Sequence, residues 1–190
     1  MIEHGQVRER QEALRALYTV DPEAARIRKR AHTEAGAAGD PLHSTVVPDN
    51  LAHPKRPYGV EWRCGIDEAV GGLHDAPNPG ELLCGALAAC FAGTVRIIAA
   101  QLGVELEQLD VEASADLDVR GALAVDPAVR VGLESMQLVV RLRPVAETPR
   151  ELTNALAEAA ERYCITLDTL RKGLPVEVTV ETSAVAAAVA

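Results

Sequence analysis

Cysteine side chains are the groups in this 190-residue sequence whose type and spacing most directly suggest chemistry. Cys84 and Cys90 both fall in the apolar stretch 78–103, which reads as one buried helix. Six residues along a helix correspond to a rotation of about 120°, so these two thiols do not share a face. Each therefore has to be weighed separately, and an inert thiol packed in the core is the ordinary interpretation of either one.

Cys90 differs from Cys84 in its surroundings and in having a candidate partner. Small residues flank it at 88, 89, 92 and 93, so another backbone or a ligand can come close. Cys164 lies far along the chain at a predicted helix end, where only the fold can bring it to Cys90. Two thiols can carry out reversible oxidation: a thiolate attacks a peroxide, becomes a sulfenic acid and is resolved as a disulfide. The attacking cysteine needs a lowered pKa, from a cation or a helix N-terminus, and Cys90 lies too deep in its own helix for that N-terminus to act alone.

The element that carries Cys84 and Cys90 has clear boundaries in the sequence. Asn78 and Pro79 form an N-cap and first-position signature, and Gly103 supplies the C′ stop. The residues between them are apolar on nearly every face. A helix without a polar face must be covered on all sides by other structure, so we expect this helix at the centre of the fold.

Periodicity and turn signals predict the elements on either side of this helix. Before it, a helix over about 6–18 and a helix start at Asp21 and Pro22 lead into a small antiparallel sheet. After it come two long strands, a helix that opens with a capping box of Thr148, Pro149 and Glu151 and ends near Cys164, a short helix and a last strand. The predicted strands are 24–32, 42–48, 58–67, 109–123, 134–145 and 175–182, and the short helix is 166–173. The order β-β-β-α-β-β-α-α-β is α+β, with sheets packed around a central helix.

Composition excludes several classes of function. The 28 acidic and 19 basic residues give a net charge of −9, which argues against a nucleic-acid partner, because phosphate binding needs a concentrated basic surface. The one basic cluster, 26–30, fits a solvated strand or helix end. No uncharged run approaches the roughly 20 residues that span a bilayer, so we expect no membrane partner and a cytoplasmic location. Thiols in that compartment stay mostly reduced.

Two segments resemble motifs of the OsmC/Ohr family. Residues 78–90, "NPGELLCGALAAC", are similar to Asn-Pro-Glu-Glu-Leu-Leu-x-x-Ala-x-x-Ala-Cys, and residues 161–178, "ERYCITLDTLRKGLPVEV", are similar to Cys-Pro-Val-x-x-x-Leu. The resemblance spans about 24–181 and implies an intertwined homodimer, with antiparallel sheets wrapped around long central helices. It implies reduction of organic hydroperoxides by a two-cysteine thiol mechanism, with Cys90 as the peroxidatic thiol and Cys164 as the resolving thiol. We expect one OsmC-like domain over 1–190, with a helical extension at 1–22 and a flexible tail at 183–190.

The sequence departs from the family at the residues that assist the peroxidatic thiol, an Arg and a Glu. Gly80 stands at the Glu position, ten residues before Cys90. Glu81 is the next residue, turned by about 100° on a helix, and is the candidate replacement. The candidate replacements for the Arg are His43, Arg63 and Arg120. A protonated His43 can lower a thiol pKa as Arg does, although each of the three is also compatible with an ordinary solvated charge.

The spacing of the residues does not support a metal site or a nucleotide site. His53, Cys64, His74 and Asp75 do not have the spacing of a metal-ligand pair, and the sequence contains no dinucleotide-binding or P-loop pattern. We therefore expect neither a metal nor another cofactor.

Two main hypotheses of function follow. The first is a thiol-dependent peroxidase whose partners are a small-molecule hydroperoxide and a thiol reductant; an aliphatic pocket would favour fatty or aromatic hydroperoxides. The second, motivated by Gly80, is a non-catalytic OsmC-like protein that binds small apolar or thiol-reactive molecules. A structural dimer with packed cysteines is a third and blander hypothesis. The sequence assigns no role to Cys64 and Cys84.

Overall fold

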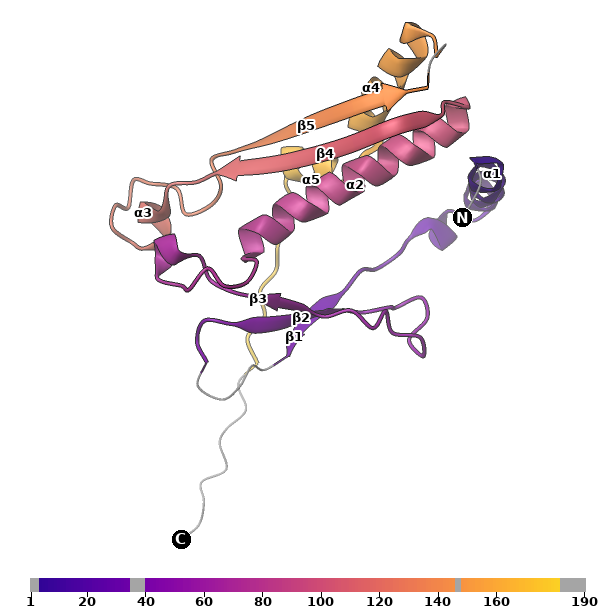
Figure 1. Cartoon of the computed structure of the whole chain (residues 1–190). Helices are drawn as coiled ribbons and strands as arrows, with labels where there is room; N and C mark the ends of the chain where they lie inside the picture. The colour runs from indigo at the N-terminus through magenta and orange to yellow at the C-terminus, as the bar shows by residue number, and fades with distance from the viewer. Residues whose placement is uncertain (1–3, 35–39, 146–147, 182–190) are drawn as a thin grey trace.

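One long helix, α2 (Pro79–Leu102), organises the computed structural model, which describes residues 4–34, 40–145 and 148–181 (Figure 1). The helix begins with a capping box. The Asn78 side chain accepts a hydrogen bond from the Glu81 N–H at 3.0 Å, and the Glu81 carboxylate accepts from the Asn78 N–H at 2.8 Å. Gly103 ends the helix with a positive φ of 68°, so both predicted boundaries are confirmed.

α2 packs against a two-stranded sheet and two C-terminal helices. β4 (Leu106–Asp116) pairs antiparallel with β5 (Ser135–Pro144), and β4 runs along α2 (Figure 1). α4 (Arg150–Tyr163) and α5 (Ile165–Lys172) also contact α2. The core lies where these elements meet and contains Phe91, Val95, Ala99, Val104, Leu156, Ala160 and Cys164. Its α2 members recur every four residues, which turns one face of the helix inward.

A second antiparallel sheet lies on the other side of α2 (Figure 1). Its strands, β1 (Ala31–Glu34), β2 (Ser44–Pro48) and β3 (Trp62–Cys64), are ordered β1-β2-β3. A loop with the 3₁₀ turn η2 (Glu68–Val70) joins β3 to α2. Gly72 is required in this loop, because a Cβ there would lie 2.0 Å from the Ile66 carbonyl oxygen. The predicted α+β architecture, with antiparallel sheets on either side of a long helix, is confirmed.

The N-terminal helix α1 (His4–Val20) contacts α2 and is longer than the predicted range 6–18. The Gln101 side chain of α2 donates a hydrogen bond to the Gln11 side chain of α1 at 2.7 Å. The 3₁₀ turn η1 (Pro22–Ala25) follows, and its N-cap Asp21 accepts from the Ala24 N–H at 3.4 Å, as the sequence predicted.

Three predicted strands are shorter than their sequence patterns. The basic cluster 26–30 has no strand structure, and β1 begins only at Ala31. Of the segment 58–67, only the three residues of β3 pair, with Ser44, Thr45 and Val46 of β2. The strand predicted over 109–123 ends at Asp116, and Asp118 then caps a one-turn helix, α3 (Val119–Ala122).

Two C-terminal predictions are wrong in detail. Thr148 does not cap α4; the N-cap is Pro149, and the Thr148 hydroxyl instead donates to the Val145 carbonyl at 3.0 Å. The strand predicted at 175–182 is not formed in its described part, where Val176, Val178 and Val180 are 78–82% exposed. An alternating segment needs the edge of another strand to become a strand itself, and no described strand of this chain pairs with it. The tail at 183–190 lies outside the described residues.

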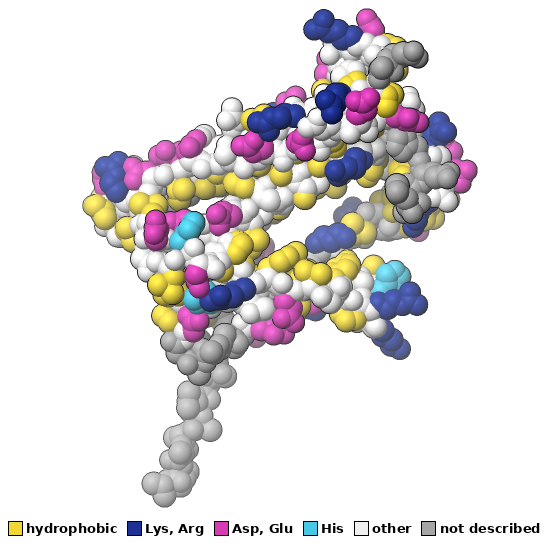
Figure 2. All heavy atoms as spheres, in the orientation of Figure 1, with side chains coloured by type: hydrophobic (Ala, Val, Ile, Leu, Met, Phe, Trp, Pro, Cys, Tyr) yellow, Lys and Arg dark blue, Asp and Glu magenta, His cyan; other side chains and the backbone are white. Residues whose placement is uncertain are grey.

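The described part of the chain does not cover α2 on all sides, although the apolar sequence of this helix predicted full cover. The large apolar side chains of α2 that are exposed are Leu83, Ile97 and Leu102, at 36–41% exposure. Figure 2 shows hydrophobic side chains on both sides of the gap between the α2 layer and the β1–β3 sheet. By length and composition α2 could cross a membrane, but it carries Glu81 and Arg96 and supplies the core helix of this fold.

Candidate active site

Cys90 and Cys164, the two cysteines singled out in the sequence, meet in the structure. Cys90 lies in the middle of α2, and Cys164 lies at the corner between α4 and α5. The Cys164 N–H donates to the Ala160 carbonyl at 3.1 Å and its own carbonyl accepts from the Asp168 N–H at 3.0 Å, so this residue belongs to both helices. Its side chain is buried and that of Cys90 is half-buried. Both are free thiols, and Cys90 packs against the core cluster that contains Cys164.

Hydrogen bonding with the first turn of α5 contributes to the acidity of both thiols. Thr166 and the Ile165 N–H act to lower the pKa of Cys90. The N–H groups of Leu167 and Thr166 act to lower that of Cys164. Cys164 is the N-cap residue of α5, and no side-chain hydrogen bond caps this helix.

These contacts give the two thiols different acidities. Burial raises the pKa of Cys90, but hydrogen bonds from Thr166 and from the neighbouring thiol and N–H group outweigh it and hold this pKa below its ordinary value. Burial also raises the pKa of Cys164, and the adjacent Cys90 adds to the rise. Cys90 is therefore the first of the pair to ionise. The leading influences on it come from uncharged groups of α5 and its N-cap rather than from a cation.

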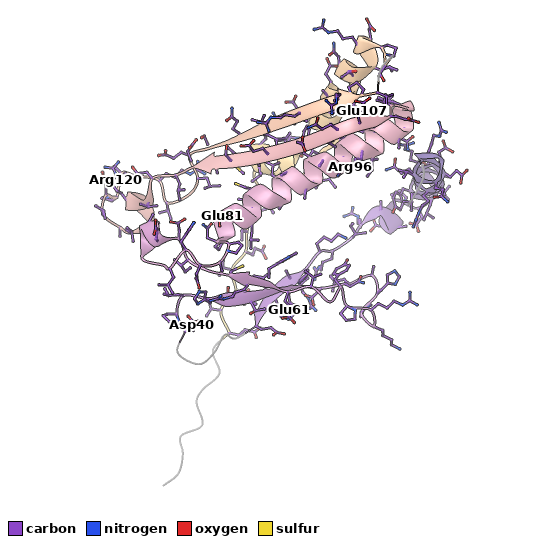
Figure 3. All side chains as sticks on the ribbon, in the orientation of Figure 1. Asp40, Glu61, Glu81, Arg96, Glu107 and Arg120 are labelled. Carbon is purple, nitrogen blue, oxygen red and sulfur yellow. The ribbon has the colours of Figure 1, made fainter. Side chains whose placement is uncertain are left out.

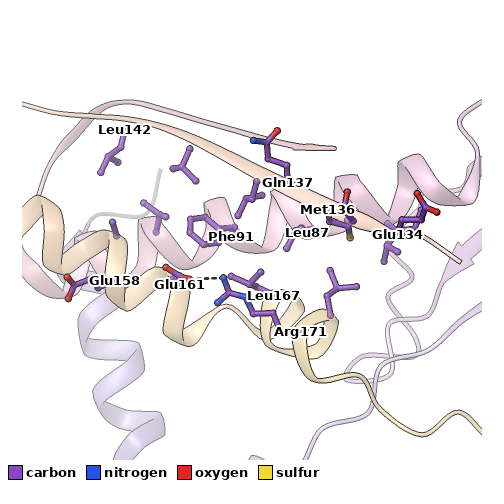
Figure 4. Close-up of a pocket in the computed structure, with 18 of the residues that line it drawn as sticks. Leu87, Phe91, Glu134, Met136, Gln137, Leu142, Glu158, Glu161, Leu167 and Arg171 are labelled. Atoms are coloured by element: carbon purple, nitrogen blue, oxygen red, sulfur yellow. Dashed lines mark hydrogen bonds and ion pairs between the residues drawn. The ribbon is translucent and has the colours of Figure 1, made fainter. Parts of the chain in front are cut away.

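An open cavity of about 930 Å³ lies between α2, β5, α4 and α5 (Figure 4). Phe91, the residue after Cys90 on α2, and Leu167 of the first turn of α5 both line it, whereas Cys90 and Cys164 themselves do not. Its other apolar side chains include Leu87, Met136, Leu138, Leu142 and Leu156. Charged groups line it too: Arg171 donates to Glu161 at 2.7 Å. The cavity can take an amphiphilic or apolar molecule.

Two candidate cations, His43 and Arg63, belong to a cluster with carboxylates. His43 lies 2.8 Å from both Asp40 and Asp75, and Arg63 donates to Asp75 at 2.9 Å. Hydrogen bonds to Asp75 and Asp40 raise the pKa of His43, against burial and the charge of Arg63. The hydrogen bond from His43 lowers the pKa of Asp75. The cluster joins the small sheet to the loop before α2, and its charges are engaged with one another.

Glu81 and Arg120 also have partners of their own. Figure 3 places Glu81 at the first turn of α2, nine residues before Cys90, which corresponds to a rise of about 13 Å along the helix. The Glu81 carboxylate accepts from the Asn78 N–H. Arg120, on α3, donates through Nε to Asp118 at 2.9 Å. The roles that the sequence suggested for Glu81, His43, Arg63 and Arg120 beside Cys90 stay predictions.

Cys64 and Cys84 lie apart from the thiol pair. Cys64 is buried at the end of β3, and its sulfur donates to the Trp62 carbonyl at 3.8 Å. Cys84 lines a second cavity of about 470 Å³ with Ala113 and Ala115 of β4. Among the residues that the structure describes, no three His, Cys, Asp or Glu side chains are grouped to hold a metal ion.

The sequence analysis missed Ile165 and Thr166 as functional residues. One signal was present in the sequence. The predicted helix at 166–173 begins close after Cys164, and the N–H groups of its first turn need hydrogen-bond acceptors outside the helix. The sequence could not tell that they point at Cys90, because that contact is made by two elements distant in the chain.

The sequence also matches a family of known proteins. Residues 72–179, more than half of the chain, match the profile of a family described as OsmC-like protein. No curated protein matches the sequence.

Several solved structures share the fold. An OsmC-like protein from Mycoplasma pneumoniae has a TM-score of 0.57 at 12% identity, over 77% of this chain and 89% of that one. An OsmC-like protein of unknown function from Vibrio cholerae O1 biovar eltor strain N16961 has a TM-score of 0.58 at 13% identity, over 76% and 94%. An organic hydroperoxide resistance protein from Elizabethkingia anophelis, with thiocyanate bound, has a TM-score of 0.50 at 17% identity, over 78% and 91%. At these identities the likeness is one of fold.

Proposed function

Because the chain belongs to the OsmC-like protein family, we propose that it is a thiol-dependent peroxidase that reduces organic hydroperoxides with Cys90 and Cys164. The observation that carries this proposal is the packing of Cys90 against the core cluster that contains Cys164, together with the lowered pKa of Cys90. A lowered pKa gives the thiolate that attacks peroxides, and an adjacent second thiol allows the product to be resolved before overoxidation.

The reaction proceeds in three balanced steps. The Cys90 thiolate attacks the terminal oxygen of the hydroperoxide, the O–O bond breaks, and the alkoxide leaves and takes a proton from solvent as an alcohol. The Cys164 thiol then condenses with the Cys90 sulfenic acid, which forms a disulfide and releases water. An external thiol reductant returns both cysteines to the thiol form by thiol–disulfide exchange and is itself oxidised to a disulfide. The chain's own residues suffice for the first two steps, so the proposal includes no cofactor.

The cavity between α2, β5, α4 and α5 supports an organic rather than an inorganic peroxide as substrate. Phe91, Leu87 and Leu167 give it apolar walls, and burial of an alkyl or aryl group there contributes about 25 cal/mol per Å². Hydrogen peroxide has no such group to bury. We therefore expect fatty or aromatic hydroperoxides to be preferred.

The functional unit in this proposal is an intertwined homodimer in the cytoplasm, where reductants keep the thiols reduced. Leu83, Ile97 and Leu102 are large apolar side chains of α2 that the described part of the chain leaves exposed. The segment 174–181 presents three exposed valines in alternation but has no described strand beside it. A second copy of the chain supplies both missing partners, a cover for α2 and a sheet edge for the C-terminal segment.

A binding protein without turnover is the alternative. It is favoured by one specific observation: Glu81 caps its own helix, and His43 and Arg63 are engaged with Asp75, so the described chain offers Cys90 none of the charged groups that the family resemblance implied. Such a protein would bind small apolar or thiol-reactive molecules in the cavity.

Steady-state consumption of cumene hydroperoxide with a dithiol reductant separates the two functions. The peroxidase proposal expects turnover by the wild-type protein, faster than with hydrogen peroxide, and none by Cys90→Ser. Cys84→Ser is the matched control, because that thiol lies on the same helix but lines another cavity. Equal background rates for the wild-type and Cys90→Ser proteins would establish the binding protein instead.

A further inference from the structure

We propose that His43 is a proton-controlled latch between the small sheet β1–β3 and the loop before α2. The protonated imidazole binds Asp75 of this loop through Nε2, and the neutral imidazole binds Arg63 of β3 through the same atom. His43 immediately precedes β2, and Asp75 lies in the loop that joins β3 to α2. The latch is independent of the thiol chemistry proposed above, because none of its groups takes part in that reaction.

The Nε2 atom of His43 has two hydrogen-bond partners of opposite type. It lies 2.8 Å from Oδ1 of Asp75, and an ionised carboxylate can only accept a hydrogen bond. It also lies 3.0 Å from Nη2 of Arg63, and a guanidinium can only donate. A ring nitrogen donates when it carries a proton and accepts when it does not. Nε2 can therefore satisfy only one of these partners at a time, and its proton decides which one.

The other ring nitrogen of His43, Nδ1, keeps its proton. It lies 2.8 Å from Oδ2 of Asp40, and Oδ1 of the same carboxylate accepts from the Leu42 N–H at 3.0 Å. The hydrogen bonds from Leu42 and His43 lower the pKa of Asp40, so this carboxylate stays ionised. A neutral imidazole with its proton on Nδ1 donates to Asp40 and accepts from Arg63, whereas a proton on Nε2 leaves only the bond to Asp75. His43 therefore loses its proton from Nε2.

This exchange of partner changes which elements His43 connects. The protonated form ties the start of β2 to the loop through which the small sheet joins α2 (Figure 1). The neutral form ties β2 to β3, its neighbour in the sheet, where Thr45 already pairs with Arg63. Arg63 still donates to Asp75 at 2.9 Å, so the sheet keeps one of its two side-chain bonds to Asp75 and loses the other. The His43 side chain is only 13% exposed, so water does not readily replace the lost bond.

The charges around His43 set the pH range of the exchange. The charged groups that face the imidazole are Asp40 before β2, Arg63 on β3 and Asp75 in the loop. Hydrogen bonds to Asp75 and to Asp40 raise the pKa of His43 above 6.5, against burial and the charge of Arg63. The bond to Asp75 is therefore present below pH 6.5 and is lost as pH rises through the higher pKa of the folded protein.

Nuclear magnetic resonance of the full-length protein between pH 5 and pH 9 measures the latch at two places. Proton–nitrogen correlation spectra of the imidazole give its protonation and tautomer, and we expect neutral His43 to carry its proton on Nδ1. Hydrogen exchange of the Gly65 N–H reports how firmly the end of β3 is held to the loop, because this group donates to the Pro77 carbonyl at 3.0 Å. Corrected for intrinsic exchange, its opening should increase about threefold to tenfold as His43 loses its proton.

Two variants separate His43 from the other histidine of the site. Asp75→Asn should lower the pKa of His43 and abolish the step in Gly65 exchange, because an amide can offer Nε2 either a donor or an acceptor. His74→Asn is the matched control. It removes the loop imidazole that lies 3.4 Å from Asp67, asparagine suits its φ of 50°, and the step should persist.

Three results would overturn the latch. A neutral His43 with its proton on Nε2 would still donate to Asp75. Gly65 exchange without a step at the titration of His43 would mean that the lost bond does not hold the sheet. A step that persists in Asp75→Asn, or disappears in His74→Asn, would assign the pH dependence to another group. No hydroperoxide is used, so these results leave the proposed peroxidase to its own test.

Discussion

Cys90 of α2 packs against the core cluster that contains Cys164, the residue between α4 and α5. Burial raises the pKa of both thiols, yet only Cys90 gains enough donors to lie below its ordinary value. The pair is therefore asymmetric before any substrate arrives. In the proposed peroxidase, this asymmetry favours Cys90 as the attacking thiol and Cys164 as the resolving thiol.

Replacing Cys164 with serine tests this division of roles. The serine hydroxyl keeps a donor beside Cys90 but removes the resolving sulfur. We expect the first oxidation to proceed and Cys90 to accumulate as sulfinic acid under excess cumene hydroperoxide, which peptide masses detect. Cys84→Ser should form the same product as the wild type. A disulfide between Cys90 and another cysteine in the Cys164→Ser protein would show that the resolving thiol is a different one.

The His43 cluster predicts how stability depends on pH. The pKa of His43 is raised, so its contribution is complete below the unfolded value of 6.5 and is lost as pH rises through the higher folded value. The pKa of Asp75 is lowered, so its contribution is present above 3.8 and is lost as pH falls through the lower folded value. We therefore expect His43→Gln to lower the melting temperature most at mildly acidic pH.

The exposed His53 supplies the control for that experiment, as His53→Gln removes an imidazole outside the cluster. Thermal unfolding of both variants between pH 4 and pH 9 gives the comparison. A deficit for His43→Gln that is the same at every pH would contradict the ionic role of the cluster.

Glu81 offers a test of whether its carboxylate serves the helix or the reaction. Gln at this position can still accept from the Asn78 N–H and complete the capping box, so Glu81→Gln should fold normally and keep hydroperoxide turnover within about twofold of the wild type. Asn78→Ala should cost about 1 kcal/mol of unfolding free energy. A large loss of turnover in stably folded Glu81→Gln would mean that the negative charge acts in catalysis.

The C-terminal valines test the dimer. We expect the wild-type protein to have the mass of two 20.2 kDa chains by size-exclusion chromatography with light scattering. Val178→Asp should shift the population toward monomer, because a charge is placed in a strand that pairs with the partner. Val125→Asp changes an equally apolar side chain that is 66% exposed beside α3, and should leave the dimer intact. A monomeric wild-type protein would contradict the intertwined unit.

Elements with local signals were predictable from the sequence, and elements that depend on a partner were not. α2 was predicted to its last residue because Asn78, Pro79 and Gly103 act within one turn of its ends. The segment 175–182 has the alternation of a strand, but no described strand pairs with its described residues, 175–181. Thr148 had two local uses for its hydroxyl, as a cap or as a donor to Val145, and composition does not distinguish them.

The candidate site, like the fold, could be predicted only in part from the sequence. The pairing of Cys90 with Cys164 was implied by resemblance, since two motifs fixed two positions. The donors of Ile165 and Thr166 were not predictable, because they act across the contact between α2 and α5. His43 and Arg63 both bind Asp75, which lies in the loop before α2, and His43 also binds Asp40. No short-range sequence pattern connects Asp75 with His43 and Arg63.

The central claim is that Cys90 and Cys164 form a redox pair. Its most direct test is to reduce the full-length protein anaerobically, add one equivalent of cumene hydroperoxide and map the peptide masses. The account predicts a Cys90–Cys164 disulfide within seconds. All four thiols still free after minutes would contradict it and would leave an OsmC-like protein that binds without chemistry.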